Sequence, residues 1–157
     1  SLYSDRINKI KSFGQDACIG VDVIVGYPTE SDEDFFETYN FLKGIDISYL
    51  HVFTYSERGN TEAINLEPAV PHSERSRRSR ILRELSDKKK SAFYEESIGE
   101  IKPVLVEKNK NGMLFGYTDN YIKTRIQGPV SLENTIQNVL ISDFKKSYVE
   151  CEILTTN

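Results

Sequence analysis

CIGVDVIVGYPTESDEDFFETYNFLKG, residues 18–44, is the stretch that decides the fold. Residues 18–26 are apolar almost throughout, which is typical of a parallel strand covered on both faces. After a turn, Ser31 and Asp34 have the spacing of a capping box, and Gly44 is expected to end the helix that they begin. The helix carries apolar side chains at helical spacing, namely Phe35, Tyr39 and Leu42. The stretch therefore predicts one strand–turn–helix unit of a parallel sheet.

The segments on either side repeat this alternation. A helix is expected over residues 2–13, a second strand over residues 48–54, and a long charged helix from Pro71 to about residue 96. The apolar side of that last helix is expected to hold Leu82, Leu85, Ala92 and Phe93. This order predicts two βα units of an α/β parallel sheet. Because two parallel strands bury little core, we expect them to be part of a larger sheet.

From residue 98 onward the pattern changes to short alternating strands. We expect them over residues 101–107, 112–118, 121–127, 136–142 and 147–153, separated by turn sequences such as KNKNG and SDFKK. Five short antiparallel strands in one small domain favour a closed barrel of the OB-like kind. The chain thus divides into an α/β part, residues 1–97, and an all-β part, residues 98–157.

Composition argues against several classes of protein. A net charge of −4 is not the basic footprint of an obvious nucleic-acid-binding protein, and no apolar run approaches the length of a membrane span. Cys18 and Cys151 are expected to be buried, reduced thiols of a cytoplasmic protein. With no C-x-x-C pair and two histidines, the chain is not expected to hold an iron–sulfur cluster by itself. A helical opening without Met indicates a piece of a longer protein.

Strand alternation separates the two faces of the expected sheet. On the first strand the side suited to helices carries Ile19, Val21, Val23 and Val25, and the opposite side carries Cys18, Gly20, Asp22, Ile24 and Gly26. The second strand points Tyr49, His51, Phe53 and Tyr55 to that opposite side. Ligands bind at the carboxyl ends of parallel strands. Loops 26–30 and 54–61 are therefore expected to form one wall of a pocket.

Plainer interpretations compete with this one. The Gly-Tyr-Pro sequence at residues 26–28 is also an ordinary strand-to-helix turn. By itself, His51 is more typical of a hydrogen-bonded core histidine than of a base or ligand, and Arg58 fits an exposed turn. Asp22 is harder to explain in that way, because a buried carboxylate inside a strand needs a partner.

Three segments carry a family resemblance: residues 17–43, the run SYLHVFTYSERGNTEA at residues 48–63, and the V-P-x-x-x-R helix start at residues 70–75. Together with the five-stranded tail, they resemble the radical S-adenosylmethionine methylthiotransferases of the MiaB-like family over essentially the whole chain. Thr29 stands where that family usually has glycine, and Gly59-Asn60 replaces a proline–glycine pair. The resemblance implies a C-terminal fragment of such an enzyme.

The resemblance also implies domains and cofactors. Residues 1–97 would be the last βα units of a partial radical-SAM α/β barrel, and residues 98–157 a TRAM domain. The parent protein would use S-adenosylmethionine and two 4Fe-4S clusters, whose cysteine ligands, a C-x3-C-x2-C triad and three more, lie outside this chain. The S-adenosylmethionine would be bordered by Ile24, Gly26, Pro28, Phe53, Tyr55 and Ser56. We assign no catalytic residue or metal ligand here, since the clusters and cofactor supply the reactive species.

By the same resemblance, the TRAM-like part is a docking module for RNA. The candidate RNA-binding residues combine aromatic surface with cations, and they are Lys108, Lys110, Tyr117, Tyr121, Lys123 and Arg125. An ordinary solvated barrel face is the plainer interpretation, and Glu150 and Glu152 limit any basic patch. The arginines at residues 75–83 of the connecting helix are expected to be solvated, because they spread around the helix.

The leading hypothesis for function follows from the resemblance. The parent would insert a methylthio group at C2 of N6-threonylcarbamoyladenosine, next to the tRNA anticodon, by radical SAM chemistry. The fragment alone would be inactive and would supply a cofactor wall and a docking surface for the anticodon stem-loop. Alternatives are the isopentenyladenosine branch, the branch acting on an aspartate of a ribosomal protein, and a non-catalytic interaction fragment. We also expect a cytoplasmic location, no membrane contact, and self-association through exposed sheet edges.

Overall fold

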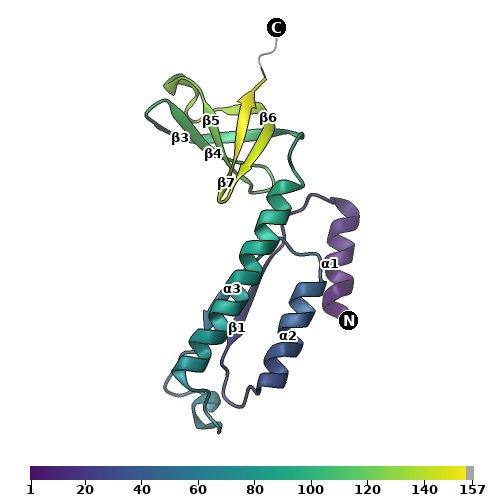
Figure 1. The fold of residues 1–157 in the computed structure, drawn as a ribbon, viewed down its shortest axis with the longest axis vertical. Coiled ribbons are helices and arrows are strands. Elements are labelled where there is room, and N and C mark those ends of the chain that lie inside the picture. Colours follow the sequence, from purple (N-terminus) through teal and green to yellow (C-terminus); the bar gives the residue numbers. More distant parts are fainter. Residues whose placement is uncertain (155–157) are drawn as a thin grey trace. The chain divides into compact units, whose positions relative to one another are not determined.

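The computed structural model describes residues 1–154, which form two compact units (Figure 1). The boundary between the units falls between Lys90 and Ser91, inside a long helix. The predicted domain boundary between residues 97 and 98 lies just past the end of the same helix. No helix in the described part of the chain combines the length and the apolar character needed to cross a membrane.

Helices and two parallel strands alternate in the first unit, as the sequence predicts. The elements are α1 (Leu2–Phe13), β1 (Gly20–Val25), α2 (Asp32–Gly44), β2 (Tyr49–Thr54), the short 3-10 helix η1 (Glu62–Asn65) and α3 (His72–Glu95). Strands β1 and β2 pair in parallel from Gly20↔Tyr49 to Val25↔Thr54. Side chains at paired positions therefore share one face of the sheet.

The predicted capping box at the start of α2 is confirmed. The Ser31 hydroxyl accepts from the Asp34 N–H at 3.1 Å, and the Asp34 carboxylate accepts from the Ser31 N–H at 2.9 Å. The helix ends at Gly44 as predicted, but without a left-handed glycine cap: Gly44 is the last helical residue, and the extended residue Ile45 follows it as the C-cap. The helix ends by turning into extended chain, so no left-handed glycine is needed there.

Helices cover one face of the two-stranded sheet. The buried cluster contains Ile7, Val21, Val25, Phe35, Leu42, Ile47, Leu50, Leu82 and Leu85. On the opposite face Ile24 is 60% exposed and Phe53 is 53% exposed. Asp22 and His51 are exposed there as well, so the expectation of a buried Asp22 carboxylate is wrong. Ala92 of α3 is also exposed, so its predicted place on the apolar side of the helix is wrong, whereas Phe93 is buried as predicted.

Five strands form the second unit. They are β3 (Ile101–Lys110), β4 (Met113–Thr118), β5 (Lys123–Gln127), β6 (Ile136–Lys145) and β7 (Tyr148–Ile153), with a short 3-10 helix η2 (Val130–Leu132) before β6. Their pairing closes into a barrel in the order β3-β4-β5-β7-β6. The prediction of an all-antiparallel barrel is wrong, because β5 and β7 pair in parallel. Directions cannot alternate all the way around a ring with an odd number of strands, so one pair must be parallel.

The barrel interior is filled by side chains that alternate with the outward ones. The most deeply buried apolar side chains are Val104, Val106, Leu114, Ile122, Ile126, Val139, Ile141 and Val149, and Thr124 is buried among the polar ones. Strands β3 and β6 run past the predicted ends at residues 107 and 142, because each contains a β-bulge that interrupts the alternation there. Gly116 is required on β4, since a Cβ at this position would lie 2.0 Å from the Leu105 carbonyl oxygen.

Candidate functional site

The carboxyl ends of β1 and β2 bring together the two loops that the sequence singles out. The Tyr55 N–H donates to the Val25 carbonyl oxygen at 2.8 Å, extending the strand pairing by one step. The Tyr27 and Tyr55 rings meet edge to face, with centroids 5.4 Å apart. Ile24 and Phe53 are register partners on the open face of the sheet. Four of the six predicted cofactor-binding residues therefore belong to one region, since Gly26 follows directly after Val25.

The other two predicted residues differ in exposure. Pro28 is buried within the loop after β1, whereas Ser56 is exposed just beyond Tyr55. The loop is held by the N–H of Thr29, which donates to the Pro68 carbonyl oxygen at 2.9 Å. Thr29 has a φ of 73°, in the left-handed region that explains why glycine suits this position. All six predicted cofactor-binding residues remain predictions.

Gly26 is needed for a reason that the sequence does not reveal. Its φ is +76°, and a Cβ at this position would lie 2.3 Å from Cγ of Arg75. Its N–H donates to Glu30 Oε2 at 3.0 Å. The space beside the Gly26 Cα is therefore filled by the aliphatic part of an arginine, and a ligand would have to approach from the open face of the sheet instead.

Arg75 links α3 to both loops. Its Nε donates to the Val70 carbonyl oxygen at 2.8 Å, and its Nη1 donates to the Tyr55 carbonyl oxygen at 3.1 Å. Its Nη2 forms an ion pair with Glu57 at 2.6 Å, and this hydrogen bond lowers the pKa of Glu57. The guanidinium carbon also lies 5.4 Å from the centroid of the Tyr55 ring. One buried side chain thus fixes the backbone where β2 ends.

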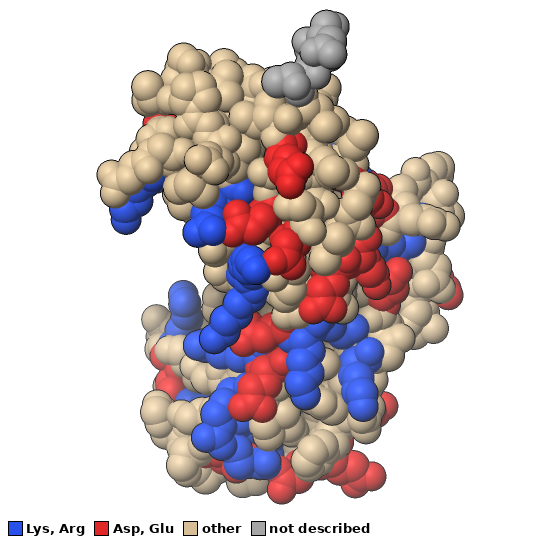
Figure 2. Space-filling model, turned by 45° about the horizontal axis from the view of Figure 1, so that its top comes forward, with Lys and Arg blue, Asp and Glu red and all other residues tan. Residues whose placement is uncertain are grey.

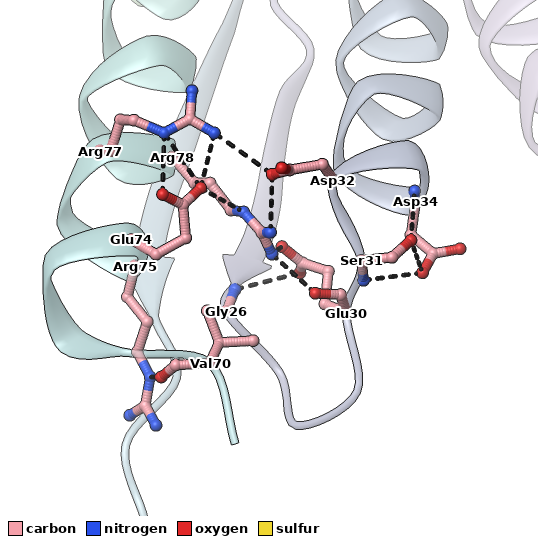
Figure 3. A network of polar contacts seen from close by, with 10 residues as sticks. All are labelled: Gly26, Glu30, Ser31, Asp32, Asp34, Val70, Glu74, Arg75, Arg77 and Arg78. Atoms are coloured by element: carbon pink, nitrogen blue, oxygen red, sulfur yellow. Dashed lines mark hydrogen bonds and ion pairs between the residues drawn. The ribbon is translucent and has the colours of Figure 1, made fainter. Parts of the chain in front are cut away.

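A second arginine fixes the loop after β1 (Figure 3). Arg78 Nη1 contacts Glu30 Oε1 at 2.5 Å and the Glu30 carbonyl oxygen at 3.0 Å, while Nη2 contacts Asp32 at 3.0 Å. Its Nε donates to Glu74 at 3.0 Å. Burial disfavours the charge of Arg78, but the hydrogen bonds to Glu30 and Asp32 outweigh that effect and raise its pKa. The acidic first turn of α2 is thereby tied to α3.

The expectation that the arginines of α3 are solvated is wrong for two of them. Arg75 is 7% exposed and Arg78 is 3% exposed, whereas Arg80 and Arg83 are exposed. Positions 75, 78, 82 and 85 recur at helical spacing, and this spacing could have indicated that both arginines lie on the buried face. On the face drawn in Figure 2, Lys and Arg side chains are interleaved with Asp and Glu.

In the barrel, the predicted RNA-binding residues are brought together in part. Tyr117 and Lys123 are register partners on the outer face, and Lys108 and Arg125 both pair with Phe115. Lys110 lies at the end of β3 and begins the hairpin turn through Asn111 and Gly112. Tyr121, which is 73% exposed, lies in the turn before β5. These RNA-binding assignments remain predictions.

The charge of Arg125 is already matched within the barrel. Its Nε contacts Glu150 Oε2 at 3.1 Å, its Nη2 contacts Glu150 Oε1, and its pKa is raised by the hydrogen bonds to this carboxylate. Its guanidinium carbon also lies 4.9 Å from the centroid of the Tyr148 ring. Arg125 is therefore a poorer phosphate ligand than its position on the outer face predicts.

The outer surface of the barrel also contains a groove that the sequence reasoning missed. It has a volume of about 630 Å³, and its lining includes Leu105, Glu107, Tyr117, Asp119, Tyr121 and Ile136. The sequence pattern could have indicated this groove. Leu105 and Ile136 are apolar at outward-pointing positions of their strands, where a solvated barrel face would carry polar side chains.

The structure offers no assembled metal site within residues 1–154, since no three His, Cys, Asp or Glu side chains there are grouped to hold an ion. Both cysteines are free thiols. Burial raises the pKa of Cys151 to about 12 and also raises the pKa of Cys18. Burial therefore favours the protonated form of both thiols, whereas a metal ligand must be a thiolate.

Comparison of the amino-acid sequence with those of known proteins finds relatives that match most of this chain. No family model matches the chain. The chain is 45% identical over 127 residues to the threonylcarbamoyladenosine tRNA methylthiotransferase MtaB of Aquifex aeolicus, a match that covers 80% of this chain and 30% of the relative. It is 39% identical over 145 residues to MtaB of Bacillus subtilis, covering 89% of this chain and 32% of that protein.

A third relative is named for a different nucleoside. The tRNA-2-methylthio-N(6)-dimethylallyladenosine synthase of Aquifex aeolicus is 33% identical over 152 residues, which are 97% of this chain and 34% of that protein. The chain thus spans about a third of the length of these curated relatives.

Proposed function

Because the chain belongs to the family of the tRNA methylthiotransferases that it matches, we propose that it is the part of such an enzyme that joins a wall of the S-adenosylmethionine site to an RNA-docking module. In this proposal residues 1–97 are the last βα units of a partial radical-SAM barrel. Residues 98–157 are an OB-like TRAM domain. The parent protein is a cytoplasmic enzyme that modifies tRNA at an adenosine next to the anticodon.

One observation carries the proposal for the first unit. The face of β1 and β2 that bears Ile24 and Phe53 is open, and it lies at the carboxyl ends of parallel strands, where ligands of α/β proteins bind. An exposed apolar wall suits a purine ring, and the Tyr55 hydroxyl is a buried donor without a hydrogen-bond partner in the described structure. These residues fit the adenosyl part of S-adenosylmethionine.

The division of labour at this site follows from the chemistry of the groups. When bound, S-adenosylmethionine and two 4Fe-4S clusters supply the radical and the methylthio group, and the cluster ligands belong to a part of the enzyme outside this chain. The residues of this chain orient and enclose the cofactor. Ile24 and Phe53 offer apolar contact, while Gly26 and Tyr55 hold the loop backbones through their hydrogen bonds. Alone, the chain is expected to be inactive.

The favoured substrate branch is N6-threonylcarbamoyladenosine. Two of the relatives named here carry that nucleoside in their names and share 45% and 39% identity with this chain, against 33% for the dimethylallyladenosine synthase. The isopentenyladenosine branch remains the second candidate, because its relative aligns over 97% of the chain. The ribosomal-protein aspartate branch is third, with the barrel docking protein in place of RNA.

Nucleoside analysis tests the proposal directly. In a strain lacking the full-length gene, tRNA hydrolysates should lose 2-methylthio-N6-threonylcarbamoyladenosine and accumulate the unmodified precursor. Loss of 2-methylthio-isopentenyladenosine instead would move the protein to the second branch. An unchanged nucleoside profile would overturn the assignment to tRNA.

A binding measurement tests the cofactor wall without relying on turnover. In the full-length protein, Phe53→Ala should raise the Kd for S-adenosylmethionine, measured by equilibrium dialysis, by roughly fivefold or more, because it removes exposed aromatic surface from the wall. Phe13→Ala is the matched control, since Phe13 is 83% exposed at the end of α1. Equal Kd values for both variants and the wild type would refute the wall.

A further inference from the structure

The groove on the barrel has the shape and surface of a ligand site. Its volume of about 630 Å³ is within the range of pockets that hold small organic ligands. Its lining follows a row of register partners, Ile136–Leu105–Tyr117, across β6, β3 and β4, and Tyr121 also contributes. Ile136 is 68% exposed and Tyr121 is 73% exposed. Clustered exposed apolar side chains of this kind mark binding surfaces.

Two backbone irregularities aim side chains at this groove. Tyr121 has a φ of 63°, which is unfavourable for an aromatic residue, and its N–H is held by the Thr118 carbonyl oxygen at 3.1 Å. Glu107 lies at the β-bulge of β3: Val106 and Lys108 each have a partner on β4, and Glu107 between them has none. Bulges redirect side chains, often next to functional sites.

The charges of the lining select the chemistry of the ligand. Within the described structure, the groove is lined by the carboxylates of Glu107 and Asp119 and by no lysine or arginine. Carboxylates only accept hydrogen bonds, so a complementary ligand has a flat apolar body and N–H donors at its edge. A cation lies on the next strand, since Lys123 is the register partner of Tyr117. A basic peptide would be repelled by that lysine, whereas the phosphate of a nucleotide would be attracted to it.

We infer that this groove binds one unpaired nucleobase with an exocyclic amino group, which adenine, cytosine and guanine have and uracil lacks, in an RNA whose adjoining phosphate contacts Lys123. The base stacks on Tyr117 and Tyr121, and its amino group donates to Glu107 or Asp119. This inference rests on the proposed RNA-docking function and adds to it a base preference. It also shifts the site of recognition from Arg125, which Glu150 neutralises, to the groove.

Short oligonucleotides test the inference on the 157-residue chain. Fluorescein-labelled A6, C6 and U6 ribonucleotides are titrated in an anisotropy assay at 50 and 300 mM KCl. A6 and C6 should bind more tightly than U6. Tyr121→Asn, chosen because asparagine tolerates a left-handed backbone, should weaken A6 roughly tenfold by removing one stacking partner. The factor should be the same at both salt concentrations, and Tyr121→Phe should restore binding.

Further variants separate the base contact from the phosphate contact. Glu107→Gln together with Asp119→Asn should abolish the preference for A6 and C6 over U6, because each new amide can donate to a uracil oxygen and can still accept from an amino group. Lys123→Ala should weaken all three oligonucleotides and reduce the salt slope by about 0.7. Phe13→Ala, an exposed aromatic of the first unit, should change nothing. Circular dichroism must show that each variant retains the wild-type fold.

Each contrary result has a distinct meaning. If none of the three oligonucleotides binds, both RNA docking by this barrel and the groove inference are wrong. If they bind but Tyr121→Asn matches the wild type, or A6 and C6 show no advantage over U6, RNA docking stands and the groove inference is wrong. If a short apolar peptide occupies the groove in competition with A6, the surface docks protein, and the inference is likewise overturned.

Discussion

The Arg75 side chain fills the space that a side chain on Gly26 would need, since a Cβ on the glycine would lie 2.3 Å from the arginine Cγ. The same arginine reaches the Tyr55 and Val70 carbonyl oxygens and the Glu57 carboxylate. The loops after β1 and β2 are thus held in place by a side chain of α3, which follows both loops in the sequence. The glycine makes this possible, because no other residue has room there.

Gly26→Ala is therefore expected to destabilise the first unit by roughly 2 to 4 kcal/mol. The positive φ contributes about 1 to 2 kcal/mol, and overpacking against Arg75 adds the rest. Urea unfolding at pH 7 measures the change. Gly59→Ala is the matched control, since nothing lies within 4 Å of its Cβ position and its φ is not positive; it should change stability by no more than about 0.5 kcal/mol.

A double-mutant cycle with Arg75→Ala separates the two causes. Arg75→Ala removes the Cγ and Cδ atoms that the new methyl group would meet, so the two substitutions together should cost less than the sum of their separate costs, by about 0.5 to 3 kcal/mol. Additive costs would mean that the loop moves away from Arg75 and that the backbone conformation alone requires glycine.

Features that depend on neighbouring residues could be predicted from the sequence. The bounds of α1 match the predicted residues 2–13, and the capping box at Ser31 and Asp34 is present, because both depend on spacing within a few residues. The roles of Arg75 and Arg78 could not be predicted in this way. Their partners lie far away along the chain: Tyr55 is 20 residues from Arg75, and Glu30 is 48 residues from Arg78.

The barrel shows a second limit of prediction from the sequence. Alternation correctly separates the outward Lys123 and Arg125 from the buried Ile122, Thr124 and Ile126. It says nothing about which strands become neighbours, so the parallel pairing of β5 with β7 could not be read from it. For the same reason the Arg125–Glu150 ion pair, which spans that pairing, was not predicted.

Acid should weaken the arginine network around α3. The pKa of Glu74 is lowered from its usual value of 4.5, chiefly by the hydrogen bond from Arg77 and then by that from Arg78. A carboxylate with a lowered pKa stabilises the fold fully above its unfolded pKa, and this contribution is lost as pH falls through the folded value. The free energy of unfolding should therefore begin to fall below about pH 4.5.

Chemical unfolding at pH 7, 5, 4 and 3 measures this dependence. Glu74→Gln should reduce stability at pH 7 and make the curve flatter below pH 4.5, because the titrating group is gone. Glu37→Gln, on the exposed side of α2, is the control and should run parallel to the wild type. If Glu74→Gln also runs parallel across the whole range, Glu74 does not carry this stabilisation.

Removing Glu150 should release a cation for RNA. In Glu150→Gln the Arg125 guanidinium loses its ion-pair partner, so binding of a short single-stranded RNA should tighten and the salt slope should steepen by up to about 0.7. Anisotropy titrations at several KCl concentrations provide the measurement. Glu152→Gln removes the same charge from the same strand at an exposed position. Equal slopes for the two variants would show that general charge, and not the freed Arg125, governs binding.

Thiol reactivity should distinguish the two cysteines and report on the barrel core. Burial raises the pKa of Cys151 to about 12, so at pH 8 this thiol should be almost entirely protonated and slow to react with a disulfide reagent. Cys18 has a less buried side chain, and it should react first although burial raises its pKa too. Titration with Ellman's reagent should give one slow thiol in the native chain and two rapid thiols in 6 M guanidinium chloride. A Cys18→Ser variant that still reacts at the native rate would show that the barrel opens around Cys151.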